Sequence, residues 1–174
     1  DAWRKVGAGK TALLVIVPRH PQRFDEVARL IATRGFSLQR RSDGQPVAAD
    51  TEVWLGDSMG ELFAYYAAAD VAFVGGSLLD YGCQNLIEPC AVGTPVLIGP
   101  STFNFAEAAL GALAAGAARQ CPDAGSLVAA ALALLADPAS RARMGKAGRE
   151  FAARHRGATE KTLALVERFI PAAR

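Results

Sequence analysis

Apolar runs and helical repeats alternate along the chain and predict alternating strands and helices. Residues 12–17 (ALLVIV) form an unbroken apolar run ending at Pro18, the pattern of a parallel strand buried on both faces. Apolar side chains then recur at helical spacing, which predicts a helix over residues 21–34. Residues 1–10 lack either pattern and are expected to form a connector into the first strand.

The same two patterns continue towards the C-terminus. Strands are predicted at residues 36–41, 51–55, 71–74, 95–98 and 117–121, and helices at residues 59–69, 86–92, 104–116, 126–135, 139–154 and 159–170. Strands that alternate with helices through short connections need crossovers between parallel neighbours. The chain is therefore predicted to be an α/β domain with a parallel sheet and helices on both faces.

Composition agrees with one domain and gives little support to a metal or disulfide framework. The 174 residues are 51% hydrophobic, enough for a sizeable core in a soluble globular domain. Cys83, Cys90 and Cys121 are an odd set without C-x-x-C spacing, so we expect three reduced thiols in a reducing compartment. No signal peptide opens the chain, and no apolar run approaches the ~20 residues of a membrane helix.

Charge is unevenly distributed along the chain despite a net charge of only +2. Residues 50–118 carry acids only, whereas residues 137–174 hold nine Lys or Arg against four Asp or Glu. The cations are not interleaved with aromatic residues, so no nucleic-acid partner is expected. The basic residues of the C-terminal helices either approach anionic lipid headgroups or form a solvated helix face: Arg141, Arg143, Lys146, Arg149, Arg154 and Arg156.

In parallel α/β sheets ligands bind beyond the carboxyl ends of the strands, so residues directly after strands are candidate site residues. Arg19 is the one cation that the predicted elements place directly after a core strand, and its planar fork suits a phosphate or carboxylate. His20 either contacts the same ligand or caps the helix that begins at Pro21.

A glycine turn follows the strand at residues 71–74. Gly75, Gly76 and Ser77 allow a backbone to approach an anion closely, although such turns are also common without a ligand. The turn lacks the G-x-G-x-x-G pattern, which is also missing after the first strand, and this disfavours a dehydrogenase. Since residues 42–118 contain no Lys or Arg, we expect backbone N–H groups and helix ends to hold much of any phosphate bound there.

The sequence Asn85-x-x-Glu88 opens the helix predicted at residues 86–92 and has two interpretations. It resembles a capping box, in which Asn85 accepts from first-turn amides and Glu88 reaches back. An acid at this position of a helix start also suits the two hydroxyls of a ribose. The spacing alone does not separate these interpretations.

Four segments together resemble one known family. They are VPRHPQRFDEVARL (17–30), LGDSMGELFAYYAAADVAFVGGSL (55–78), NLIEPCAVGTPVLIGPSTFNFAEAA (85–109) and MGKAGREFAARHRGATEKTLAL (144–165). The chain resembles the C-terminal half of bacterial 3-deoxy-D-manno-octulosonic acid (Kdo) transferases over nearly its whole length. Members of that family are GT-B glycosyltransferases with two facing Rossmann-like domains. They transfer Kdo from CMP-Kdo to the lipid A precursor in lipopolysaccharide biosynthesis.

The resemblance implies that residues 1–174 form the Rossmann-like donor-binding domain, and that an N-terminal acceptor domain is absent from this chain. The family's catalytic base is an acidic residue of that N-terminal domain. We therefore expect no catalytic residue here, and a fragment that binds donor without turning it over. The resemblance implies neither a cofactor nor a metal. It places the full-length enzyme at the cytoplasmic face of the inner membrane, associated with the membrane surface.

The family's CMP contacts are matched by nine residues of this chain: Pro18, Arg19, Met59, Gly60, Glu61, Asn85, Leu86, Ile87 and Glu88. By this resemblance Glu88 binds the ribose hydroxyls, and Arg19 and the helix start at Asn85 bind the phosphate. The Met59–Glu61 turn binds the cytosine edge through backbone groups. Further candidates are His20, Gly75, Gly76, Ser77 and Gln84.

The chain departs from the family pattern in two places. Where many members have Gly-Gly-His-Asn-Pro, this chain has Gly82-Cys83-Gln84-Asn85-Leu86, and Ser101 replaces a histidine before Thr-Phe-Asn-Phe. Gln84 can donate a hydrogen bond but cannot take up a proton.

Two alternatives to a CMP-Kdo domain stay open at this stage. One is a GT-B transferase or epimerase that uses a UDP-sugar, which predicts preference for UDP over CMP. The other is a stand-alone nucleotide-binding module without an acceptor domain, which the length of the intact gene distinguishes.

Overall fold

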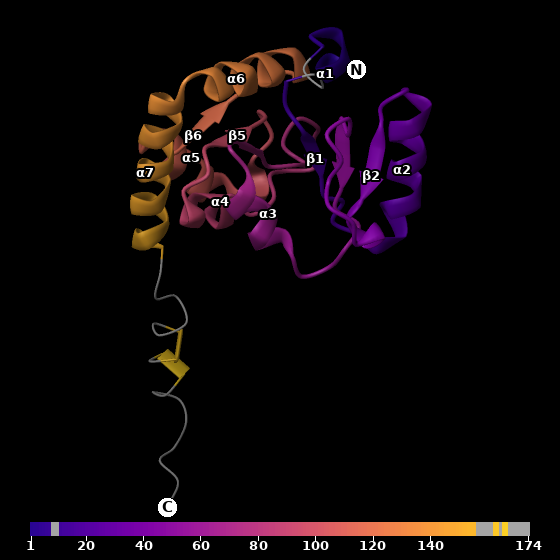
Figure 1. Cartoon of the computed structure of the whole chain (residues 1–174). Helices are drawn as coiled ribbons and strands as arrows, with labels where there is room; N and C mark the ends of the chain where they lie inside the picture. The colour runs from indigo at the N-terminus through magenta and orange to yellow at the C-terminus, as the bar shows by residue number, and fades with distance from the viewer. Residues whose placement is uncertain (8–10, 156–161, 164, 167–174) are drawn as a thin grey trace, which may run out of the picture.

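The computed structural model describes residues 1–7, 11–155, 162–163 and 165–166. Most of the helix predicted at residues 159–170 lies outside the described residues. Six parallel strands are described, and they form two three-stranded sheets with the orders β1-β3-β2 and β4-β5-β6 (Figure 1). The predicted α/β fold with parallel strands and covering helices is confirmed.

The first sheet contains β1 (Leu14–Ile16), β2 (Leu38–Arg40) and the central β3 (Val53–Leu55). Val53 and Leu55 point towards α2 (Phe24–Thr33) and pack there with Ala28 and Ile31 in one buried cluster. Trp54 lies between them on the strand and contacts Tyr65 edge-on, with ring centroids 5.6 Å apart. Because successive strand residues face opposite ways, β3 contacts α2 on one face and α3 (Leu62–Ala68) on the other.

The second sheet contains β4 (Ala72–Phe73), the central β5 (Val96–Ile98) and β6 (Ala118–Gln120). Every β5 residue is fully buried, because both faces of the strand are covered. Val96 and Ile98 pack in one cluster with α4 (Ile87–Val92), α5 (Ala106–Ala114) and α7 (Pro138–Arg154), whereas Leu97 packs in another with α6 (Ala124–Ala136). The strand predicted at residues 95–98 is therefore confirmed, and it is buried on both faces.

The first strand does not have the predicted burial on both faces. Val15 of β1 is 37% exposed, and the neighbouring Leu13 is 42% exposed. Because β1 lies at the edge of its sheet, one of its sides has no paired strand among the described residues. The prediction that residues 12–17 are buried on both faces is wrong for this chain, since an apolar run does not reveal which strands are central.

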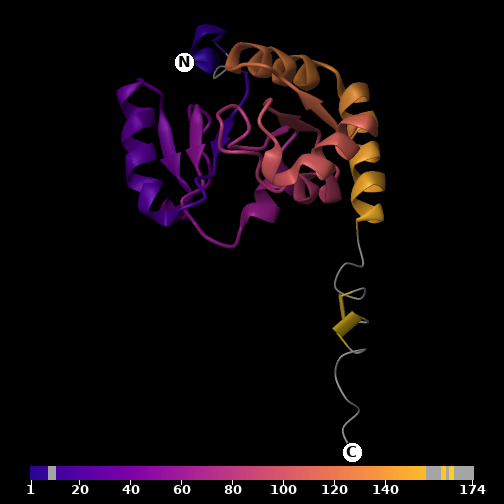
Figure 2. The same ribbon diagram turned by 180° about the vertical axis from the view of Figure 1, so that it is seen from behind.

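The connector predicted at residues 1–10 is also wrong in part. Residues Ala2–Lys5 form a short helix, α1, which lies near α6 in both views (Figures 1 and 2). Asp1 pairs with Arg34 at the end of α2, with 3.2 Å between Oδ1 and Nε. The Arg4 guanidinium lies 5.3 Å from the centre of the Phe36 ring. These contacts hold α1 against the first sheet's helix and the residues after it.

Two helices of the second sheet pack backbone to backbone. A Cβ on Gly145 of α7 would overlap the carbonyl oxygen of Gly93 at the end of α4, and a Cβ on Gly148 would lie 3.2 Å from the Cys90 carbonyl oxygen. Gly93 itself has φ +83, and the Arg149 side chain packs over it. This close approach fixes the position of α4, whose first turn carries Glu88.

Three short 3₁₀ turns complete the described elements. They are Pro21–Arg23 before α2, Arg41–Asp43 after β2 and Phe103–Phe105 before α5. The first two follow strand ends and so lie at the edge of the sheet where ligands of parallel α/β folds bind.

Candidate functional site

Arg19 and Gln84 join two of the predicted site segments. Arg19 is exposed after the end of β1, and its Nη1 atom donates a hydrogen bond to Oε1 of Gln84, which lies ahead of α4. The contact connects the end of a first-sheet strand to the start of a second-sheet helix. A guanidinium carries five N–H groups, so the remaining donors of Arg19 are available to an anion at the same place.

The helix start at Asn85 differs in detail from a capping box. Asn85 Oδ1 accepts from the Ile87 backbone N–H at 3.0 Å, and Asn85 Nδ2 donates to Glu88 Oε1 at 2.9 Å. Glu88 thus reaches back to the Asn85 side chain instead of its backbone, and Leu86 occupies the N-cap position. The contact holds one carboxylate oxygen of Glu88, and no other side chain among the described residues hydrogen-bonds this carboxylate.

Leu86 and Ile87 contribute their side chains to the core. Leu86 is 0% exposed, and Ile87 packs against the same buried cluster as Phe151. A ligand at this helix start can therefore contact Leu86 and Ile87 only through their backbone groups. The hydrophobic pattern explains this, because both side chains fill the inner face of a short helix.

The Met59–Glu61 turn projects from the end of β3. Met59 is 62% exposed, and Gly60 has φ +80, a conformation that favours glycine. Glu61 accepts hydrogen bonds from Ser58 and from Arg41, the latter with Nη2 and Oε1 3.0 Å apart. The Ser58 hydroxyl, followed by the Arg41 guanidinium, lowers the pKa of Glu61, so this carboxylate is charged at neutral pH.

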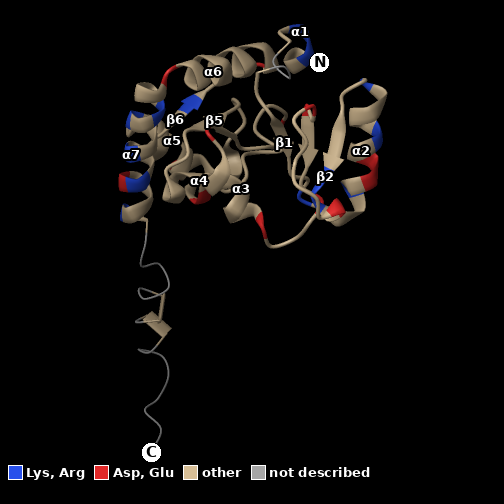
Figure 3. Cartoon of the chain, in the orientation of Figure 1, with Lys and Arg blue, Asp and Glu red and all other residues tan. Residues whose placement is uncertain are grey.

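Arg41 was missed by the sequence analysis. It follows β2 directly, so Arg19 is not the only cation placed after a core strand. The predicted strand at residues 36–41 included Arg41, whereas β2 ends one residue earlier. Arg41 is also the last cation before Arg119, and the ribbon from α3 to β5 carries no blue in Figure 3.

Asp57 anchors the same edge of the first sheet. Its carboxylate accepts from the Ser42 backbone N–H at 2.9 Å and from the Ser42 hydroxyl at 2.7 Å, and Arg40 lies 3.6 Å away. Burial alone would raise the pKa of Asp57, but the hydrogen bonds from Ser42 and the charge of Arg40 outweigh it and lower the pKa. These contacts tie the turn after β2 to the end of β3.

The glycine turn after β4 is packed against the turn after β5. Ser77 is 0% exposed, and its hydroxyl donates to the Val74 carbonyl at 2.6 Å and accepts from the Gly99 N–H at 2.8 Å. A Cβ on Gly76 would overlap the Gly82 carbonyl oxygen. The Ser77 side chain is thus closed to a ligand, and Gly76 serves close packing. Gly75 is exposed with open space beside its Cα, so its backbone is accessible.

Helices α3 and α4 pack together and bring the Met59–Glu61 turn and the Asn85 helix start to one region. Tyr66 belongs to α3, and burial, followed by the charge of Glu88, raises the pKa of Tyr66 to about 12. Within the described part of the chain no hydrogen bond connects the turn directly to Arg19 or Asn85.

The remaining candidates occupy more peripheral positions. Pro18 is half-buried, and His20 is exposed and makes no side-chain cap to the turn that follows it. Among the described residues, His, Cys, Asp and Glu form no group of three that suits a metal ion. None of the described helices has both the length and the apolar character needed to cross a membrane.

Comparison with known proteins identifies the family to which this chain belongs. The family model for glycosyl transferases group 1 matches residues 33–151. A 3-deoxy-D-manno-octulosonic acid transferase of Bordetella pertussis is 53% identical over 157 residues, which are 89% of this chain and 36% of that protein. The corresponding transferase of Haemophilus influenzae is 42% identical over 159 residues, which are 91% of this chain and 37% of that protein.

A solved structure agrees with these relatives. The crystal structure of the C-terminal CMP-Kdo binding domain of WaaA from Acinetobacter baumannii superposes with a TM-score of 0.81 at 36% sequence identity, covering 86% of this chain and 79% of that one. The chain spans little more than a third of the length of the curated relatives it matches. The resemblance drawn from the four sequence segments is thereby confirmed.

Proposed function

The chain belongs to the group 1 glycosyl transferases, and from that premise we propose that it is the CMP-Kdo-binding domain of a Kdo transferase. The observation that carries the proposal is the hydrogen bond from Arg19 to Gln84. It holds a guanidinium with spare donors beside the helix start that carries Asn85 and Glu88. A phosphate and an adjoining ribose need these two groups next to each other.

Each part of CMP is assigned to one part of this site. Arg19 and backbone N–H groups at the start of α4 bind the phosphate, where the helix end adds a favourable dipole. The Glu88 oxygen that Asn85 leaves unused accepts from the ribose hydroxyls. Backbone groups of the Met59–Glu61 turn contact the cytosine edge. Arg41 holds the Glu61 carboxylate and so supports that turn.

The chemical role of this domain is to bind the donor and stabilise the leaving CMP. As the bond between Kdo and the phosphate breaks, negative charge grows on the phosphate, and a fixed guanidinium is most effective at that stage. The base that removes the proton from the acceptor hydroxyl belongs to an N-terminal domain in this proposal. The acceptor is a lipid A precursor, and the complete enzyme works at the cytoplasmic face of the inner membrane.

Isothermal titration calorimetry with CMP tests the donor site. Arg19→Ala and Glu88→Ala are each expected to weaken CMP binding about ten-fold or more, the usual loss for a charge-assisted hydrogen bond. Arg29→Ala and Glu107→Ala remove the same charges from exposed positions on α2 and α5 and should leave the affinity unchanged. Unchanged affinity in both site variants would contradict the assignment.

A thermal-shift comparison of CMP with UMP and UDP distinguishes the proposed donor from a uridine nucleotide. A ligand that binds the folded state raises the melting temperature according to its affinity, so CMP should give the larger shift. A larger shift with UMP or UDP would favour a transferase or epimerase of UDP-sugars.

A further inference from the structure

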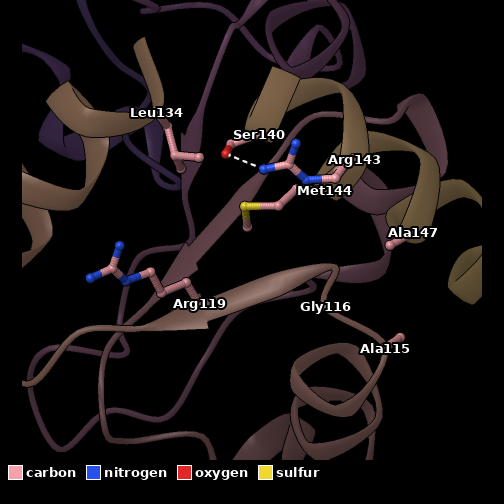
Figure 4. A pocket seen from close by; sticks show the side chains of 8 residues that line it. All are labelled: Ala115, Gly116, Arg119, Leu134, Ser140, Arg143, Met144 and Ala147. Atoms are coloured by element: carbon pink, nitrogen blue, oxygen red, sulfur yellow. Dashed lines mark hydrogen bonds between the residues drawn. The ribbon is translucent and has the colours of Figure 1, made fainter. Parts of the chain in front are cut away.

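A cavity lies on the second sheet, away from the candidate nucleotide site. It has a volume of about 410 Å³ and is formed by β6, the end of α6 and the start of α7 (Figure 4). Gly116, which precedes β6, and Met144 of α7 lie on its wall. The cavity therefore begins near the amino end of β6, whereas the candidate nucleotide site lies at the carboxyl ends of the other strands. The two sites do not share a residue.

Two arginines, Arg119 and Arg143, line this cavity. Among the described residues no ion pair and no side-chain hydrogen bond involves the Arg119 guanidinium. The Arg143 guanidinium donates to the Ser140 hydroxyl at 2.7 Å and lies near the charge of Asp137. Two guanidinium groups with spare donors at one cavity favour an anion there.

A relay of hydrogen bonds fixes Arg143. Ser140 accepts from Arg143 and donates its own hydroxyl proton to Asp137 Oδ2 at 2.5 Å. Asp137 also accepts from the Ser140 backbone N–H at 2.9 Å, so its carboxylate caps α7. The hydrogen bonds from Ser140 lower the pKa of Asp137 and keep the cap charged. The guanidinium of Arg143 is consequently held at the cavity before any ligand arrives.

The inner wall between the arginines is apolar. Leu134 is 6% exposed and, with the half-buried Met144, belongs to the cluster that also contains Leu97. In Figure 4 the Met144 side chain points into the space between α7 and β6, with Arg119 on the side of the strand and Arg143 on the helix. A free inorganic ion would leave this wall in contact with water. A phosphate ester on an apolar carrier would cover it.

We propose that this cavity binds the headgroup of an anionic phospholipid, with the phosphodiester on Arg119 and Arg143 and the glycerol and first methylenes against Leu134 and Met144. The other basic residues of α7 add a favourable potential towards an anionic bilayer. The site is independent of nucleotide binding.

Cosedimentation of the 174-residue chain with phosphatidylglycerol vesicles at 0.1 M salt tests the proposal. Arg119→Gln and Arg143→Gln are each expected to weaken binding about ten-fold or more, the loss of a charge-assisted contact to the phosphodiester, and the double variant about 100-fold. Lys146→Gln is the control, since Lys146 is 76% exposed on the same helix and does not line the cavity. It should weaken binding by no more than the ~five-fold that one cation contributes at an anionic surface.

Three results would overturn the proposal. They are no binding to phosphatidylglycerol vesicles, an equal loss for Lys146→Gln, or equal binding to vesicles of phosphatidylcholine alone. Displacement of the chain from vesicles by 5 mM inorganic phosphate at constant ionic strength, about the level of a weak anion site, would assign the cavity to a free anion instead. CMP titration of the double variant should match the unmodified chain and confirms that the variant is folded.

Discussion

The Gln84 side chain shapes the candidate site by accepting from Arg19 while remaining uncharged. A histidine at this position would exchange acceptor for donor when it binds a proton, whereas an amide presents the same oxygen at every physiological pH. The hydrogen bond from Arg19 to Gln84 therefore does not change with the protonation state of residue 84. What matters at this residue is an acceptor without negative charge.

Gln84→Glu tests this point. The new carboxylate would form an ion pair with Arg19, compete with the CMP phosphate for the guanidinium and repel the phosphate. We expect CMP affinity to fall about ten-fold at pH 7.5, measured by calorimetry. Gln84→Met, which keeps the length and removes the acceptor, should have a smaller effect. A Gln84→Glu variant that binds CMP as well as the unmodified chain would show that Arg19 does not meet the phosphate.

The cysteines make a pH-dependent contribution to stability. Burial raises the pKa of both Cys83 and Cys90 to about 11. In the unfolded chain these thiols ionise near their ordinary pKa of 9.0, so their contribution is complete below pH 9 and is lost as the pH rises towards 11. Urea unfolding at pH 8 and pH 10.5 should show a loss on the order of 1–3 kcal/mol. The Cys83→Ala/Cys90→Ala variant should lose less over the same interval.

Residue-level prediction succeeded where local sequence determines the contact and failed where distant segments meet. Asn85 and Glu88 are three residues apart, so their pairing follows from helical spacing. Arg41 meets Glu61 across 20 residues, and no local pattern signals that contact. Ser77 was misleading for the same reason, because its partner Gly99 lies on another strand's turn.

At the level of elements, the crossing of α4 and α7 determines where the nucleotide site stands. Gly145 lies so close to the Gly93 carbonyl that adding a single methyl group at Gly145 would push the helices apart. Since α4 carries Glu88 in its first turn, a shift of this helix moves the proposed ribose contact. The sequence predicted both helices from their apolar spacing, but the crossing depends on two glycines that are 52 positions apart.

Gly145→Ala is expected to reduce the free energy of unfolding by about 1–3 kcal/mol, the usual cost of overpacking a close helix contact, measured by urea denaturation. Gly125→Ala is a matched control within α6, because its Cβ would meet only the Asp123 side chain, at 3.3 Å. That variant should be neutral or slightly stabilising. If Gly145→Ala is as stable as the control, the two helices are less tightly packed than the structure indicates.

On the scale of the whole molecule, the α/β pattern predicted the order of strands and helices. Each element shows its own spacing of apolar residues along the sequence. Which strands lie at an edge is a property of the assembled sheets, and the exposed Val15 shows the difference. The matched transferases are about two and a half times as long as this chain, so they contain regions that these residues do not cover.

The chain by itself should bind CMP and transfer no Kdo. Incubation with CMP-Kdo and a lipid A precursor is expected to give no product above the level without protein, measured by mass spectrometry. A full-length transferase under the same conditions is the positive control. Transfer by the 174-residue chain would contradict the proposal that the base belongs to an N-terminal domain.

The three buried thiols also make this domain a convenient background for fluorescent reporters. Cys83, Cys90 and Cys121 are all at most 2% exposed, so maleimide dyes should pass them over in the folded state. Leu79 is 64% exposed after the glycine turn that follows β4. A dye on a Leu79→Cys variant would sit near the proposed donor site without prior removal of the native cysteines. Its emission would then follow donor arrival and departure in real time.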